Sequence, residues 1–163
     1  MTDALRFFAA LLLALTFLWS GAVKVGRAAR WLEALGVYRV PRRFEPLVFV
    51  AVPVAEVAVA GLIVIGATKP AGALSVALLC VFWVALLRAR RLEGDRLPCG
   101  CFGGTKEHDY RLLLARNLML LVPAIVLMVS GNTSIRTVPG SIDPIPAALI
   151  IVGIGVIGWT AFE

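Results

Sequence analysis

Long apolar runs alternate with short polar stretches along this chain. Five apolar segments stand out, at residues 5–25, 47–66, 71–87, 112–129 and 145–162. A helix rises 1.5 Å per residue and needs about 20 residues to cross the hydrocarbon core of a bilayer. The pattern therefore predicts an all-α integral membrane protein, a four-helix transmembrane bundle with a fifth transmembrane helix at the C-terminal end. The fifth segment is glycine-rich, which also suits close packing against a neighbouring helix.

Composition supports a membrane protein of one domain, spanning residues 1–163. The chain is 60% hydrophobic with a mean hydropathy of +0.92, and its charges fall between the apolar runs. The net charge of +6 is explained by basic residues that flank membrane spans, so we expect no nucleic-acid partner. The first segment resembles a signal peptide in carrying Arg6 before an apolar core. Its long apolar stretch and the acidic Asp3 favour a retained first span.

Basic residues are concentrated in two of the connections. The connection after the first segment and the connection after the third, with their flanks, hold Lys24, Arg27, Arg30, Arg39, Arg42, Arg43, Arg88, Arg90, Arg91, Arg96, Lys106, Arg111 and Arg116. The opposite side has Arg6, Lys69 and Arg136. We expect a multi-pass protein of the cell inner (cytoplasmic) membrane, and the positive-inside rule predicts that both long connections lie in the cytoplasm. Within the first of them, residues 31–44 fit a short amphipathic segment at the interface, since Trp31, Leu35 and Tyr38 fall near one helical face.

A Cys-Gly-Cys pair, Cys99 and Cys101, lies in the most polar connection. Two cysteines separated by one residue can close into a small, strained disulfide ring, and strain makes the bond easy to reduce. The basic neighbours Arg96 and Lys106 favour the reactive thiolate. The pair is therefore predicted to be redox-active. Because free disulfides are rarely kept in the cytoplasm, the predicted topology favours a protein that takes electrons from a cytoplasmic dithiol.

Two alternatives for the cysteine loop stay open. One is a structural disulfide, although a bond across a single glycine constrains little chain. The other is a zinc or copper site formed by Cys99, Cys101, His108 and Asp109, for which two cysteines and one histidine are a weak signature; no metal is assigned. The third cysteine, Cys80, lies within an apolar segment and is expected to be a small buried residue.

Lys24 and Glu56 are the second candidate pair. Glu56 lies inside the second apolar segment, where a carboxylate is costly unless it is paired or reaches water. Lys24 ends the first segment, so the two side chains can approach each other from adjacent helices, with Ser20 one turn before Lys24. Two interpretations remain open, an ion pair that fixes helix packing or a proton or quinone-headgroup site. Arg116 and Asn117, at the start of the fourth segment, are expected to meet lipid headgroups or the loop backbone.

These residues together resemble a known family. Ser20-Gly21 followed by Lys24, then Glu56, and above all the run from Pro98 to Gly103 are similar to the methylamine-utilisation membrane protein family MauE, within the DoxX-like group of small helical membrane proteins. The resemblance covers the first four segments. It implies a role in forming or maturing disulfides in a partner protein, together with a thioredoxin-like protein.

The leading hypothesis is a membrane thiol–disulfide oxidoreductase or redox relay. Cys99 and Cys101 would exchange with a thioredoxin-like partner, while Lys24 and Glu56 would tune a nearby polar pocket that takes a quinone. A non-catalytic membrane scaffold or assembly factor and a metal-handling membrane protein are the alternatives. The scaffold alternative predicts that cysteine variants still support the partner. The metal-handling alternative predicts that bound metal is lost when the cysteines are removed.

Overall fold

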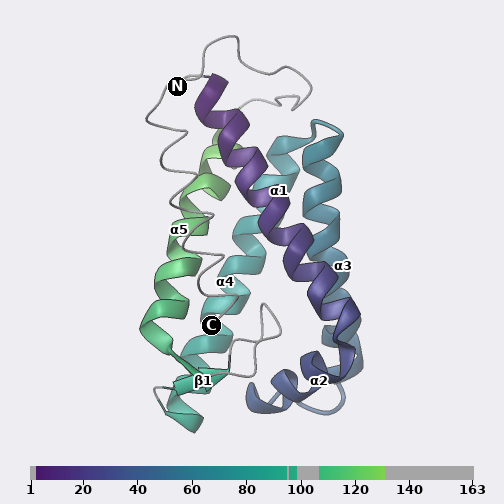
Figure 1. Cartoon of the computed structure of the whole chain (residues 1–163), viewed down its shortest axis with the longest axis vertical. Helices are drawn as coiled ribbons and strands as arrows, with labels where there is room; N and C mark the ends of the chain where they lie inside the picture. Colours follow the sequence, from purple (N-terminus) through teal and green to yellow (C-terminus); the bar gives the residue numbers. More distant parts are fainter. Residues whose placement is uncertain (1–2, 95, 99–106, 131–163) are drawn as a thin grey trace.

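Four long helices form the body of the protein in a computed structural model, which describes residues 3–94, 96–98 and 107–130 (Figure 1). The long helices are α1 (Asp3–Gly26), α3 (Glu45–Val64), α4 (Thr68–Glu93) and α5 (Tyr110–Val129). A short helix, α2 (Ala28–Val37), and two three-residue strands, β1 (Arg96–Pro98) and β2 (Glu107–Asp109), complete the described elements. Each long helix contains a span long and apolar enough to cross a membrane. The first four predicted segments are thus confirmed, and the fifth lies outside the described residues.

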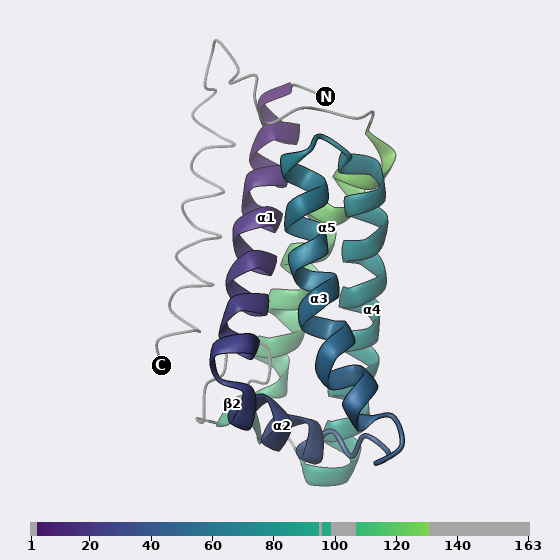
Figure 2. The same cartoon turned by 90° about the vertical axis from the view of Figure 1, so that its right-hand side faces the viewer.

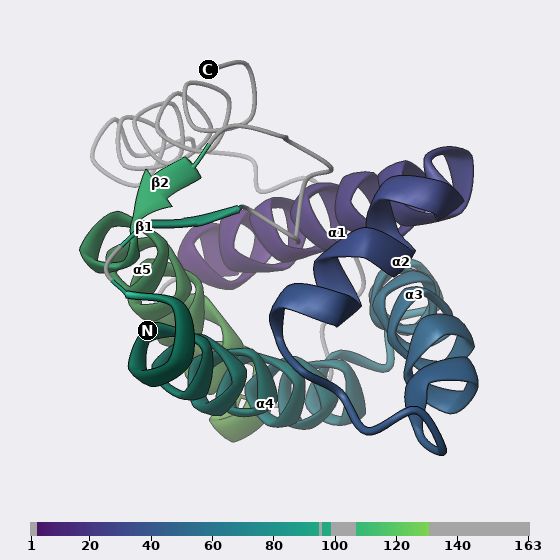
Figure 3. The same ribbon diagram turned by 90° about the horizontal axis from the view of Figure 1, so that it is seen from below.

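The four long helices close into a ring. α1 packs against α3, α3 against α4, α4 against α5, and α5 returns to α1 (Figure 3). Successive long helices run in opposite directions, and the turn from α3 to α4 takes only residues 65–67. Gly66 has φ +86 in this turn, a left-handed conformation that glycine adopts without strain. The predicted all-α bundle is confirmed.

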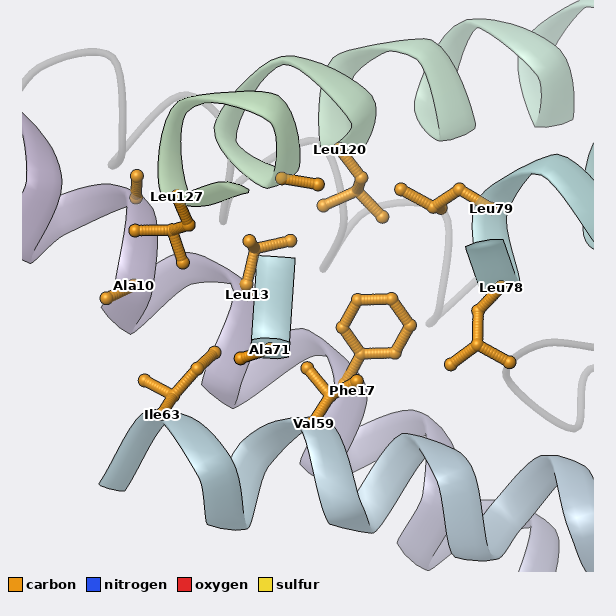
Figure 4. Packing of buried hydrophobic residues seen from close by; sticks show 12 residues of the cluster. Ala10, Leu13, Phe17, Val59, Ile63, Ala71, Leu78, Leu79, Leu120 and Leu127 are labelled. Carbon is orange, nitrogen blue, oxygen red and sulfur yellow. The ribbon is translucent and has the colours of Figure 1, made fainter. Parts of the chain in front are cut away.

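Apolar side chains fill the centre of the bundle and also cover its outside. Figure 4 shows the centre, where side chains from all four long helices meet: Ala10, Leu13, Phe17, Val59, Ile63, Ala71, Leu78, Leu79, Leu120 and Leu127. The outer faces carry exposed apolar residues such as Leu15, Val54, Val84 and Val122. An apolar exterior is what a bilayer solvates, and helices leave no backbone group in need of water.

α2 lies across one end of the bundle, at a steep angle to the long helices (Figure 2). Its residues Trp31, Ala34 and Leu35 are buried, and the Trp31 indole Nε1 donates to the carbonyl of Phe49 at 3.1 Å. The amphipathic segment predicted at residues 31–44 is therefore a helix only as far as Val37. Its apolar face covers the ends of the long helices.

The two strands form a small antiparallel ladder at the same end of the bundle as α2. Arg96 pairs with Asp109 and Pro98 with Glu107 (Figure 1). The segment 99–106, which connects them, lies outside the described residues. This ladder was not predicted, because its strands are too short to show an alternating pattern. Both long connections of the bundle thus leave and return at one end.

Candidate site around a buried lysine–glutamate pair

Lys24 of α1 and Glu56 of α3 form an ion pair inside the bundle. Lys24 Nζ lies 2.6 Å from Glu56 Oε1 and 2.9 Å from Oε2. Ser20, one turn before Lys24, accepts from Nζ at 2.6 Å and donates to Glu56 Oε1 at 2.9 Å. The exposed fraction is 2% for Lys24 and 0% for Glu56. The sequence-based expectation that these two residues approach each other from adjacent helices is confirmed.

Gly21 allows α1 and α3 to come this close. A Cβ atom at Gly21 would lie 3.0 Å from the Val57 side chain, 3.3 Å from the Pro53 carbonyl oxygen and 3.4 Å from the Glu56 side chain. The first two contacts are tighter than most side chains accept, so Val57 and the α3 backbone would have to give by a few tenths of an ångström. The small residue therefore permits the close helix approach that Ser20 and Lys24 need to reach Glu56.

Two aromatic rings flank the lysine ammonium group. Nζ lies 5.3 Å from the centre of the Trp31 ring, which belongs to α2, and 5.6 Å from the centre of the Phe82 ring, which belongs to α4. Both distances fall within the range of cation–π attraction, worth about 0.5–2 kcal/mol each. The ammonium group thus contacts residues of α2, α3 and α4, in addition to Ser20 of its own helix, α1.

Arg116 and Asn117 of α5 lie on the other side of the pair. They are 3% and 5% exposed, so they do not face lipid headgroups as one expectation had it. The other expectation, a contact with the loop backbone, stays a prediction because residues 99–106 lie outside the described residues. With Glu56, Ser20 and Thr16 they line a cavity of about 20 Å³, which is room for one water molecule. α5 begins at Tyr110, so Arg116 lies nearly two turns along this helix. The side chains of Arg116 and Asn117 line the cavity together with residues of α1 and α3.

Asn117 adds a second polar side chain beside the ion pair. Its Nδ2 is buried and has no hydrogen-bond partner among the described residues. A buried polar group without a partner is costly, so such groups are rare in folded proteins. The site therefore comprises Ser20, Lys24 and Glu56, with Arg116 and Asn117 beside them.

Cys99 and Cys101 lie outside the described residues, so their pairing stays a prediction. Their flanking strands place the ends of their segment beside α4 and α5 at the α2 end of the bundle. Asp109, a candidate metal ligand, accepts from the backbone N–H of Arg111 at 2.8 Å and caps α5. The described residues contain no group of three His, Cys, Asp or Glu side chains suited to a metal ion.

Cys80 is exposed on the outer side of α4, so the expectation that it is buried is wrong. Helical periodicity turns Leu78, Leu79 and Phe82 of α4 toward the bundle, and this leaves Cys80 beside Val81 on the outer side. A residue in an apolar segment of a membrane protein can face either the core of the bundle or the lipid.

Sequence reasoning missed Phe82 as a site residue, and it named Trp31, Arg116 and Asn117 without placing them beside the ion pair. Arg116-Asn117 does carry a signal, because a charged and an amide side chain stand together within an apolar segment. Nothing in the sequence marks Phe82 among many other apolar residues. Its contact with Lys24 depends on how the helices pack.

Four membrane-spanning helices around a buried lysine–glutamate pair define a small multi-pass membrane protein. Residues 2–130 match the family described as Methylamine utilisation protein MauE, and the chain belongs to that family. The matched range includes the ion pair and the two cysteines.

One relative, the Methylamine utilization protein MauE of Paracoccus denitrificans, is 36% identical over 131 residues. That match covers 76% of this chain and 66% of the relative, so the chain spans slightly less than two thirds of the relative's length. No solved structure gives a significant match.

Proposed function

We propose that this protein is a membrane thiol–disulfide redox protein whose cysteine pair exchanges with a thioredoxin-like partner. The observation that carries the proposal is the Cys-Gly-Cys pair, Cys99 and Cys101, in the segment that joins β1 to β2. The ladder holds Pro98 and Glu107, which flank this segment, at the α2 end of the bundle. A soluble partner can reach a connection at that end, whereas it cannot reach the interior of the bundle.

The exchange follows ordinary thiol–disulfide chemistry. A thiolate of the partner attacks one sulfur of the Cys99–Cys101 disulfide and forms a mixed disulfide. The partner's second thiol then attacks the mixed disulfide and releases this protein as a dithiol. Two electrons and two protons pass from the partner to the cysteine pair, and the partner leaves oxidised.

The Lys24–Glu56 pair has a supporting role in this proposal. It brings an ammonium and a carboxylate into the bundle at the end where α2 and the ladder lie. Such a pair can hold or move a proton beside a redox site, and ionisable groups inside a membrane are commonly functional. The same proposal assigns the chain to the inner membrane. It also assigns the chain to methylamine utilization, the process that the name of its relative states.

Substituting the cysteines tests the proposal. We expect Cys99→Ser and Cys101→Ser each to reduce exchange with a reduced thioredoxin to the uncatalysed rate, because one sulfur cannot complete the cycle. Exchange is measured by trapping free thiols with a maleimide that shifts the protein on a gel. Cys80→Ser is the matched control, since Cys80 lies on the outer side of α4, and it should exchange like the unmodified protein.

Full exchange in both cysteine variants would rule out the redox role. If these variants also still supported the partner in the cell, the scaffold alternative would replace it.

A further inference from the structure

A second and larger cavity lies at the α2 end of the bundle. Its volume is about 170 Å³, and its walls come from α2, α3 and α4, with Lys24 of α1 also in the lining. An apolar cavity of about 150 Å³ is known to hold a benzene molecule, so there is room here for about six carbon atoms of a ligand.

The lining of this cavity favours a hydrocarbon. Apart from Lys24, Trp31 and Tyr38, it consists of apolar side chains. The Lys24 ammonium group already donates to Ser20 and Glu56, and the indole Nε1 of Trp31 already donates to a backbone carbonyl. A polar ligand would give up its hydrogen bonds with water and gain none from these two groups, which is costly. An alkyl chain has no such bonds to lose.

The cavity reaches the lipid-facing side of the bundle. Val81 belongs to its lining and is 59% exposed on the outer side of α4, within the membrane span Thr68–Leu92. At this depth the bundle is surrounded by hydrocarbon rather than by water. A ligand that enters past Val81 therefore comes from the bilayer.

Arginines follow the edge of the cavity in the connection between α2 and α3. Tyr38 and Val40 of this connection line the cavity, and the exposed Arg39 stands between them in the sequence. The connection, residues 38–44, contains three arginines and no acidic residue. In Figure 3 it passes α4 on its way to α3. The edge of the cavity at the α2 end is thus positively charged.

α4 adds a further arginine at the same end. Ala85 and Arg88 follow Val81 by four and seven residues, so the three lie near one face of the helix. Seven residues of helix rise about 10 Å, and Arg88 is exposed that much nearer to the α2 end than Val81. A positive charge at the membrane surface above an apolar cavity matches the build of an anionic phospholipid.

We propose that this cavity binds an acyl chain of an anionic phospholipid, with the phosphate group held by Arg39, Arg42 and Arg88 at its edge. Glu45, the first residue of α3, offsets one of these charges. Guanidinium groups form paired hydrogen bonds with phosphate, and basic residues between membrane-spanning helices suit lipid headgroups. The site does not depend on the proposed redox role of the cysteines.

Lipid binding is tested by fluorescence in mixed micelles of a non-ionic detergent. In a reporter chain Trp19, Trp83 and Trp159 are changed to phenylalanine, so that Trp31 in the cavity wall is the remaining tryptophan. Bromine atoms on an acyl chain quench tryptophan at short range. We expect brominated phosphatidylglycerol to give a saturable quench. Its half-maximal mole fraction should be at least about fivefold lower than for phosphatidylcholine with the same chain.

Filling the cavity tests where the chain binds. Val48→Phe places a ring in the cavity from α3 and should abolish the saturable quench. Val50→Phe is the matched control, because Val50 is 58% exposed and lies on the opposite face of the same helix. It should behave like the reporter chain. Val52→Phe and Val54→Phe form a second pair of the same design if Val48→Phe does not fold.

Removing the arginines tests where the phosphate binds. In a variant with Arg42→Gln and Arg88→Gln, the two brominated lipids should act within about twofold of each other. The control carries Arg90→Gln and Arg111→Gln, which remove the same charge at the same end of the bundle. Those two guanidinium groups lie 3.9 and 5.9 Å from the ring of Tyr110, a residue of α5 outside the cavity lining. The control should keep its preference for phosphatidylglycerol.

Four outcomes would overturn the proposal. The first two are the absence of a saturable quench and an equal quench in the Val48→Phe and Val50→Phe variants. The third is equal action of the two lipids on the reporter chain, which would make this a site for any acyl chain without a choice of headgroup. The fourth is an unchanged preference after the loss of Arg42 and Arg88, which would place the headgroup elsewhere.

Discussion

The Lys24–Glu56 pair satisfies most of what a buried ion pair needs. Removing two charged groups from water is costly, and their attraction offsets this cost only when further hydrogen bonds complete the geometry. Ser20 supplies such a bond to each partner, and Trp31 and Phe82 place the faces of their rings toward the ammonium group. Each residue of the pair therefore depends on the other.

Breaking the pair from one side should destabilise the protein strongly. We expect Lys24→Met to lower the free energy of unfolding by about 3–5 kcal/mol, because it leaves the Glu56 carboxylate buried without its counter-charge. The double variant Lys24→Met with Glu56→Gln should recover most of this loss, since both charges are gone. Unfolding in mixed detergent micelles measures both changes.

The same double variant separates the two interpretations of the pair. A stable double variant that still exchanges at the normal rate would make the pair purely structural. A stable double variant without exchange would give it a role in the chemistry. If Lys24→Met alone were as stable as the unmodified protein, the ion pair itself would be in question.

At the scale of the helices, two glycines set the spacing between neighbours. Gly21 brings α1 against α3 at the site, as described above. Gly72 brings α4 against α5, where an added Cβ would lie 2.5 Å from the Met128 backbone nitrogen and 2.8 Å from the Ala124 carbonyl oxygen. The helix backbones themselves are in contact there, so the neighbour cannot yield by turning a side chain.

Gly72→Ala should therefore destabilise the bundle by about 1–3 kcal/mol, the usual cost of overpacking a well-packed core. Gly61→Ala on α3 is the matched control, because a Cβ there meets nothing within 4 Å. It should leave stability unchanged or raise it by up to about 1 kcal/mol through the better helix propensity of alanine. Thermal unfolding of both variants in the same detergent gives the comparison, and equal stability would contradict the close α4–α5 contact.

At the scale of the whole molecule, the charge asymmetry coincides with the placement of α2 and the ladder. The end of the bundle that carries them has the exposed arginines Arg27, Arg30, Arg39, Arg42, Arg43, Arg88, Arg90, Arg91 and Arg111. Arg6 and Lys69 lie toward the other end. The positive-inside rule thus predicts that the α2 end, with the connection that carries the cysteines, faces the cytoplasm.

Labelling of single cysteines tests this orientation. In a chain with Cys80, Cys99 and Cys101 changed to serine, we introduce Glu33→Cys on α2 or Ile65→Cys in the α3–α4 turn, both at exposed positions. A membrane-impermeant maleimide should label Ile65→Cys in intact cells and Glu33→Cys only after permeabilisation. The reverse pattern would place the cysteine connection outside and favour a role in oxidising exported proteins.

Much of this protein could be predicted from the sequence alone. Four helices were predicted within a few residues of their ends, because a bilayer demands about 20 apolar residues for each span. α4 extends six residues beyond its predicted end, since arginines can continue a helix into the headgroup region while their side chains reach water. Lys24 and Glu56 stood out because charged residues are costly inside apolar segments.

Only the tertiary structure decided which side of each helix faces the core. In a soluble protein a polar face marks the exterior, but here both the core and the lipid side are apolar, so the usual amphipathic signal is lost. Cys80 therefore proved to lie outside and Arg116 inside, against expectation. The contact between Trp31 and the Lys24 ammonium group likewise exists only because α2 crosses the end of the bundle, and that placement depends on packing between residues far apart in the chain.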